Sequence, residues 1–213
     1  MKKIISSIVL VPLIILSAPD NKLMSEIHEQ LNEIPVASNI YDIESGLKES
    51  EKKNYEVAID FIKAHEGYAE GNAYTCVSGN LTIGYGHVIK DGEVFPEHIS
   101  KKSADSLLRV DFKKAFSLAN GLYPDMHGSR KMAVTHFIFS KGIGAFLSSG
   151  LKTKIDSNEN VDEEFNKWCY YTDYKTGKKL YSKVAAGIQK WEREMWHQDD
   201  LMYTKDEITR RKF

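Results

Sequence analysis

The stretch from His65 to His87, HEGYAEGNAYTCVSGNLTIGYGH, has the composition of a site rather than of a plain core segment. It combines a glutamate, a cysteine and a threonine with many glycine, tyrosine and histidine residues. Just upstream, apolar residues recur at helical spacing: Val57, Ala58, Phe61 and Ile62. This pattern predicts a helix that begins near Asn54 and ends at Gly67. Glu66 is therefore expected at the C-terminal end of a helix.

The segment that follows Glu66 predicts a small antiparallel sheet. Residues 73–86 are rich in strand-forming side chains and are split by Ser78-Gly79-Asn80, which is typical of a hairpin. Residues 87–95 are expected to add a third short strand, with a turn at Asp91-Gly92. Cys76 and Thr82 are the polar side chains of this hairpin, and its turn can bring them opposite each other.

The pattern becomes helical from Ser100 onward. Ser100 suits the N-cap of a helix that is expected to end at Asn120-Gly121. Three more helical segments are predicted, namely 129–146 with a break at Gly142, 161–171 and 183–197, and residues 172–181 are expected to form a glycine-containing loop. The chain thus predicts an α+β fold that is mostly α, in which a long helix joins a small β-hairpin lobe to a larger helical lobe.

The two ends of the chain differ from this central part, which we place at residues 54–200. Residues 1–18 have a basic head and an apolar run of 15 residues, typical of a secretion signal or a signal anchor. The run is short for a membrane span and is interrupted by a proline. We therefore expect export to the periplasm or the exterior, with transient membrane contact. Residues 19–53 are expected to be a polar linker with a short helix, and residues 201–213 a charged tail.

Charge is spread unevenly over the 213 residues. Residues 1–100 carry 8 Lys and Arg against 15 Asp and Glu, whereas residues 101–213 carry 21 against 15. The cationic half favours an anionic partner such as a wall polymer, a nucleic acid or a membrane, and solvated helix faces explain it equally well. The two cysteines, Cys76 and Cys169, exclude a disulfide-rich scaffold but leave one bridge open.

Several kinds of site do not fit the motif around Glu66. The stretch HEGYA lacks the second histidine of a helical zinc site, and GYGHVI lacks the third glycine of a dinucleotide loop. No phosphate-binding loop or nucleophile elbow occurs. A papain-like pair of Cys76 and His87 is disfavoured by the flanking residues. A glycosidase fits better, because Glu66 among tyrosines can serve as the carboxylic acid that protonates the leaving oxygen.

These residues carry a resemblance to a known family. The sequence is similar to the phage-type lysozymes, or endolysins, in Glu66-Gly67, Tyr74, Cys76, Gly79 and the block TIGYGH at 82–87. The resemblance continues through 99–111 and 136–151 and covers roughly residues 54–197. It departs from the family in three ways: the interval from Glu66 to Cys76 is one residue longer than usual, Ser140 replaces an asparagine, and GIQKWERE replaces a segment that often carries paired arginines.

The resemblance implies a lysozyme-like two-lobed fold and a muramidase that cleaves the β-1,4 bond between N-acetylmuramic acid and N-acetylglucosamine. The mechanism would be inverting, with Glu66 as general acid, Thr82 holding the attacking water and Cys76 assisting. The resemblance also implies that no metal or other cofactor is needed. A thiol is a weaker base than a carboxylate unless its thiolate is stabilised, so Cys76 is expected to matter less than Glu66.

The resemblance implies further roles around these three residues. Tyr85 and Ser140 would contact substrate in the cleft, and His87 would pair with Asp111 to link the hairpin lobe to the long helix. The expected partner is the glycan strand of peptidoglycan rather than nucleic acid, and the protein is expected to be a monomer. The alternative is a catalytically weak wall-binding or host-interaction protein on the same fold. In that case Glu66 is a solvated helix-end carboxylate, and Cys76 and Thr82 only fill strands.

Overall fold

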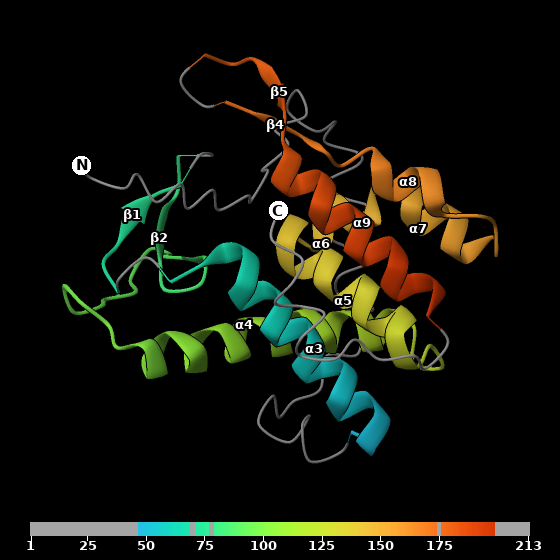
Figure 1. Cartoon of the computed structure of the whole chain (residues 1–213), viewed down its shortest axis with the longest axis horizontal. Coiled ribbons are helices and arrows are strands. Elements are labelled where there is room, and N and C mark those ends of the chain that lie inside the picture. Colours follow the sequence, from blue (N-terminus) through green and yellow to red (C-terminus); the bar gives the residue numbers. More distant parts are fainter. Residues whose placement is uncertain (1–46, 69–70, 77–78, 174–175, 199–213) are drawn as a thin grey trace.

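The computed structural model describes residues 47–68, 71–76, 79–173 and 176–198. Over these ranges the protein is mostly helical, with two small antiparallel sheets (Figure 1). This confirms the predicted α+β fold with a small β lobe and a larger helical lobe. The predicted signal segment 1–18, most of the linker 19–53 and the tail 201–213 lie outside the described residues.

Helix α3, Glu49–Glu66, leads directly to the candidate site. It begins at Glu49, five residues before the predicted start at Asn54. The acidic residues Glu49 and Glu51 lie in its first turn, where the helix dipole favours negative charge. The backbone N–H of Lys48 also donates to Glu51 Oε2 at 3.2 Å. This hydrogen bond stabilises the start of the helix, and the spacing of the apolar residues does not reveal it.

The small lobe contains a three-stranded antiparallel sheet in the order β1-β2-β3, as predicted. Its strands are short: β1 is Tyr74–Thr75, β2 is Leu81–Ile83 and β3 is His87–Val88. Tyr74, and not Cys76 as expected, lies opposite Thr82, and Ile83 lies opposite His87. Ile83 is fully buried, so the sheet turns one face toward the protein interior.

Helix α4, Lys101–Leu122, is the long helix that connects the two lobes (Figure 1). Its N-cap is Ser100, as predicted, and the Ser103 N–H donates to Ser100 Oγ at 3.1 Å. The predicted end at Asn120-Gly121 is wrong, because the helix continues to Leu122. Asn120 Oδ1 accepts a hydrogen bond from the buried Lys131 at 2.6 Å, and this contact keeps a residue common at helix ends inside the helix.

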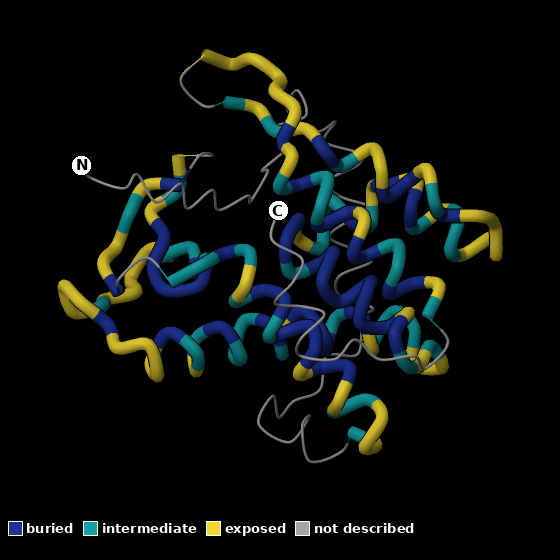
Figure 2. Tube along the Cα trace, in the orientation of Figure 1, coloured by how far each residue is buried: buried dark blue, intermediate teal, exposed yellow. Residues whose placement is uncertain are grey.

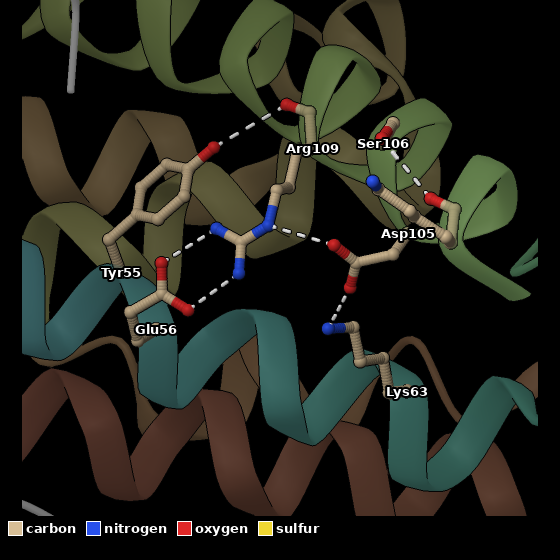
Figure 3. A network of polar contacts seen from close by, with 7 residues as sticks. Tyr55, Glu56, Lys63, Asp105, Ser106 and Arg109 are labelled. Atoms are coloured by element: carbon tan, nitrogen blue, oxygen red, sulfur yellow. Dashed lines mark hydrogen bonds and ion pairs between the residues drawn. The ribbon is translucent and has the colours of Figure 1, made fainter.

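Helices α3 and α4 are held together by a cluster of charged side chains (Figure 3). Arg109 of α4 donates to both oxygens of Glu56 of α3, at 2.6 and 2.7 Å, and its Nε donates to Asp105 at 3.1 Å. Lys63 of α3 also pairs with Asp105. A bidentate arginine–carboxylate pair fixes geometry more tightly than a single ion pair. The cluster therefore sets the register of the helix that ends at Glu66.

The larger lobe is built around helix α5, Gly128–Lys141, which is buried along most of its length (Figure 2). It ends at Gly142, as predicted, where φ is 87°. Helix α9, Lys183–His197, also occurs as predicted, and its Trp191 stacks on Phe61 of α3 with ring centroids 4.0 Å apart. Three short helices complete the lobe: α6 Ile143–Leu147, α7 Gly150–Asp156 and α8 Asp162–Asn166.

The segment between α8 and α9 corrects the sequence analysis. The predicted helix 161–171 is limited to α8, and the predicted loop 172–181 is largely a hairpin of β4, Tyr170–Thr172, and β5, Lys179–Tyr181. Tyrosine and threonine favour strands, and Gly177 takes the turn with φ 67°. Within the described part of the chain, no helix is long and apolar enough to cross a membrane.

Candidate active site

Glu66 is the last residue of α3, and Gly67 ends the helix with φ 71°. The carboxyl is buried, with 5% of the residue exposed, although it stands at a helix end where side chains are usually solvated. Glu66 Oε1 lies 3.3 Å from His65 Nε2, and Oε2 has no hydrogen-bond partner among the described residues. A buried carboxyl oxygen without a partner is costly, which makes this position a candidate for function.

A cleft of about 550 Å³ opens at Glu66 between the two lobes. Its walls come from the end of α3, the β2–β3 region, the middle of α4 and the end of α5. The polar residues that line it include Glu66, Asn80, Tyr85, His87, Asp111, Ser140 and Lys141. Two more open hollows of similar volume, along residues 49–56 and 72–97, do not reach Glu66. The cleft therefore brings Glu66 together with Tyr85 and Ser140, two of the residues predicted to contact substrate.

Tyr85 and Ser140 reach this cleft from opposite lobes. Tyr85 is 5% exposed and packs against Tyr68, with ring centroids 5.9 Å apart. Burial raises the pKa of Tyr85, and the nearby Asp105 and Tyr68 add to the effect, so its hydroxyl stays protonated. The Ser140 hydroxyl donates to the Phe137 carbonyl of its own helix at 3.4 Å. This long contact leaves the oxygen of Ser140 able to accept another hydrogen bond.

Cys76 and Thr82 lie in the hairpin beside the cleft but are not among the described residues that line it. Thr82 is fully buried, and its hydroxyl donates to the Asn80 carbonyl at 3.1 Å. Cys76 is 4% exposed, and its N–H donates to the same carbonyl at 2.9 Å. Asn80 itself lines the cleft, so both residues contact the backbone carbonyl of a cleft residue.

Tyr74 lies near enough to both Glu66 and Cys76 for their charges to affect its hydroxyl. The pKa of Tyr74 is raised well above its usual value, first by burial and then by the charges of Glu66 and Cys76. Its hydroxyl is buried and has no hydrogen-bond partner among the described residues. Neither Cys76 nor Cys169 is in a disulfide, so the bridge that the sequence left open is not formed in this structure.

His87 and Asp111 form the expected contact between β3 and α4. His87 Nδ1 lies 2.5 Å from Asp111 Oδ2, and Nε2 lies 3.0 Å from Glu93 Oε2. Burial lowers the pKa of His87, but the hydrogen bonds and charges of Asp111 and then Glu93 outweigh it, and the net pKa is raised. The two carboxylates thus favour the cationic form of this imidazole, which lines the cleft together with Asp111.

Beneath Glu66 lies a buried polar cluster that the sequence analysis missed. His136 of α5 and Glu192 of α9 are both fully buried, with His136 Nδ1 2.6 Å from Glu192 Oε1. Burial raises the pKa of Glu192 to about 8, although Lys141 and His65 oppose the change. Burial likewise lowers the pKa of His136 far below its usual value. Both side chains therefore favour their neutral forms.

Lys141 connects this cluster to the cleft. Its ammonium nitrogen is buried without a hydrogen-bond partner among the described residues, and the side chain lines the cleft at the end of α5. Burial lowers the pKa of Lys141, while the carboxyls of Glu192 and then Glu66 oppose this shift. A signal for the cluster existed in the sequence: His136 and Lys141 lie in the mostly apolar stretch 132–141, where a charge requires a partner.

The described residues contain no group of three or more His, Cys, Asp and Glu side chains placed to hold a metal ion. The chemistry available at the cleft is then that of a buried carboxyl, a nearby lysine and imidazole, and hydroxyl groups from two lobes. This set can transfer a proton to a bound molecule and stabilise the carboxylate that remains.

Comparisons with known proteins agree with this geometry. The family model described as phage lysozyme matches residues 63–193. An endolysin of Acyrthosiphon pisum secondary endosymbiont phage 1 is 30% identical over 118 residues, which span 53% of this chain and 77% of that protein.

Solved structures give the same fold. The muramidase domain of SpmX from Asticaccaulis excentricus aligns with a TM-score of 0.57 at 21% identity, covering 66% of this chain and 95% of that one. The endolysin from Escherichia coli O157:H7 phage FAHEc1 aligns with a TM-score of 0.58 at 23% identity, covering 75% and 99%. At these identities the two structures establish a common fold.

Proposed function

Because this chain belongs to the phage lysozyme family, we propose that it is an exported muramidase that cleaves the β-1,4 bond between N-acetylmuramic acid and N-acetylglucosamine. Membership of the family makes it a lysozyme-type hydrolase whose substrate is peptidoglycan. The bond cleaved, the roles of individual residues and export are the parts that we propose.

The observation that carries the proposal is the buried Glu66 carboxyl at the wall of the interlobe cleft. Hydrolysis of a glycosidic bond requires an acid that protonates the departing oxygen. Glu66 Oε2 has no hydrogen-bond partner among the described residues and is the oxygen available for this task. Once the proton has left, the carboxylate would be stabilised by Lys141 and by His65, whose Nε2 lies 3.3 Å from Oε1.

The attacking water would be held on the hairpin side of the cleft. Thr82 donates its hydroxyl to the Asn80 carbonyl, and Asn80 lines the cleft. A rotation of the Thr82 hydroxyl toward a water beside Asn80 would orient that water without movement of the backbone. Cys76 shares the same carbonyl through its N–H and would assist by positioning this turn. Attack by water from the face opposite Glu66 inverts the configuration of the sugar.

The decisive experiment is lysis of purified peptidoglycan sacculi by the wild type and by Glu66→Gln. This change preserves shape and removes the proton donor, so activity should fall by at least about a hundredfold. Glu164→Gln is the matched control, because Glu164 is also 5% exposed but does not line the cleft. Equal lysis by Glu66→Gln and the wild type would refute the assignment and favour the wall-binding alternative.

Cys76 is tested separately with Cys76→Ser and Cys76→Asp. Because Cys76 is buried and would act only by positioning, both variants should keep lytic activity. Loss of activity in both, with unchanged thermal unfolding, would indicate that the thiol itself takes part in the reaction.

Export rests on the basic head and the 15-residue apolar run of residues 1–18. The same segment would provide transient membrane contact before release, and the released enzyme would act as a monomer. Fractionation of cells that express the full chain should place it outside the cytoplasm, and deletion of residues 1–18 should retain it inside.

A further inference from the structure

The β4–β5 hairpin is a feature that the proposed active site does not use. Tyr170 pairs with Tyr181 and Thr172 with Lys179, and the Ser182 N–H donates to the Cys169 carbonyl at 2.8 Å to close the base. Its two strands pair only with each other in the described part of the chain. Figure 1 shows the hairpin standing clear of the helices above the start of α9.

The hairpin exposes apolar side chains to an unusual degree, and Figure 2 shows most of its trace coloured as exposed. Among the described residues, five large hydrophobic side chains are exposed, and three of them are here: Tyr170 at 43%, Leu180 at 39% and Tyr181 at 56%. The rings of Tyr170 and Tyr181 lie on one face, with centroids 5.5 Å apart and planes at 70°. Exposed apolar residues that gather at one place usually mark an interaction surface.

The same segment is cationic. Residues 170–181 contain three lysines and a single acidic residue, Asp173. The carboxylate of Asp173 accepts hydrogen bonds from the N–H and hydroxyl of Thr176, both at 2.7 Å, so it is occupied within the turn. Lys179 holds its ammonium 5.4 Å from the centroid of the Tyr170 ring. The surface thus combines flat aromatic faces with positive charge, which suits an anionic partner that has flat apolar faces of its own.

The base of the hairpin also adjoins the cleft. Trp168, just before β4, packs against Phe137 of α5, one turn before the cleft residue Lys141, with ring centroids 5.0 Å apart. A polymer that extends out of the cleft along the end of α5 would therefore approach the hairpin.

We propose that the β4–β5 hairpin is a second binding surface for the peptidoglycan strand, on which Tyr170 and Tyr181 stack against sugar rings while Lys178 and Lys179 pair with carboxylates of the wall. This inference rests on the proposed function. The hairpin holds the insoluble polymer so that the cleft encounters successive bonds, and it takes no part in cleavage. A tyrosine pair that served only to stabilise the hairpin would leave sacculus binding unchanged in the variants below.

The test compares the full-length wild type with Tyr170→Ala/Tyr181→Ala and with Lys178→Gln/Lys179→Gln. Binding is measured by co-sedimentation with sacculi, with each variant also carrying Glu66→Gln so that the polymer stays intact. Turnover is measured separately, with Glu66 restored, on a short soluble peptidoglycan oligosaccharide. Leu81→Ala/Val94→Ala is the matched control, because these two exposed apolar residues lie on the smaller lobe.

The tyrosine variant should bind sacculi about tenfold more weakly, the scale expected for two lost aromatic contacts. The lysine variant should weaken binding several-fold at low salt and little at high salt, because ionic pairing is screened. Turnover of the short oligosaccharide should be unchanged in both, as should binding by the control.

Sacculus binding equal to wild type in both hairpin variants would overturn the inference, and so would binding to anionic phospholipid vesicles in place of sacculi. An equal loss of oligosaccharide turnover would overturn it too, because the hairpin would then support the cleft itself. Thermal unfolding of each variant should match the wild type. A wild type that cleaves no oligosaccharide would instead refute the proposed function, so the two failures are distinguishable.

Discussion

The two small sheets of this protein have similar sequences and opposite surroundings. Both are built from short strands that contain tyrosine and threonine, and each has a glycine with left-handed φ in or beside a turn, Gly84 at 65° and Gly177 at 67°. The first sheet buries Thr82 and Ile83 completely, whereas β5 is exposed at every residue. Strand formation is therefore a local property in both, and burial against α3 and α4 distinguishes the sheet beside the candidate acid.

The largest expected difference between the two sheets concerns stability. Ile83→Ala removes a fully buried side chain and should lower the free energy of unfolding by about 2–5 kcal/mol. Leu180→Ala removes one that is 39% exposed and should cost less than about 0.5 kcal/mol. Urea unfolding followed by fluorescence measures both values. A similar loss of unfolding free energy in both variants would show that Leu180 is buried in solution, against another part of the protein or a second molecule.

The two glycines test the same contrast at the backbone. Both residues have left-handed φ, so alanine should cost about 1–2 kcal/mol at either position. An added Cβ at Gly84 would also lie 3.1 Å from Ala104 Cβ, whereas one at Gly177 meets nothing within 4 Å. Gly84→Ala should therefore lower the unfolding midpoint in urea more than Gly177→Ala. A larger effect of Gly177→Ala would mean that α4 moves away from the methyl group added by Gly84→Ala at little cost.

A pair of threonines separates catalysis from strand structure. Thr82→Val preserves shape and removes the hydroxyl proposed to orient water, and sacculus lysis should fall about tenfold, the effect of about 1.4 kcal/mol in the barrier. Thr172→Val makes the same change on an exposed strand and should leave lysis unchanged. Full activity of folded Thr82→Val would remove this threonine from the proposed mechanism.

The smallest effect concerns pH. The pKa of His87 is raised above 6.5 in the folded protein, so the folded state binds the proton more tightly than the unfolded chain. Its stabilising contribution is then complete below pH 6.5 and is lost as the pH rises through the folded-state value. The unfolding free energy of the wild type relative to His87→Gln should decrease over this range. A difference that grows with pH would contradict a cationic His87 between Asp111 and Glu93.

The sequence predicted the first sheet better than the second for a physical reason. Around Glu66, helix spacing, a glycine stop and a turn signal all favour one structure, and the family resemblance covers the same residues. At 172–181 the lysines and the short strands lack an alternation of buried and exposed positions, because neither face is buried. A hairpin that turns neither face to the core needs no alternation of apolar and polar residues, so its sequence resembles that of a loop.

The candidate site divides in the same way. The sequence alone identified Glu66, Tyr85 and Ser140, which the structure brings to one cleft, and also the contact between His87 and Asp111. It gave no indication that Cys76 and Thr82 are buried and outside the cleft lining, because which face of a short strand is covered depends on the helices packed against it.

The sequence by itself determined the order of the elements from α3 to α5, the helix end at Glu66 and the membership in a lysozyme family, because these depend on neighbours within a few residues and on a distinctive motif. Only the tertiary structure revealed the buried cluster of Lys141, His136 and Glu192 and the exposed hairpin between α8 and α9. Residues 136 and 192 are distant along the chain, and their proximity follows from the packing of α5 against α9. Burial and charge pairing across such distances are properties of the folded molecule.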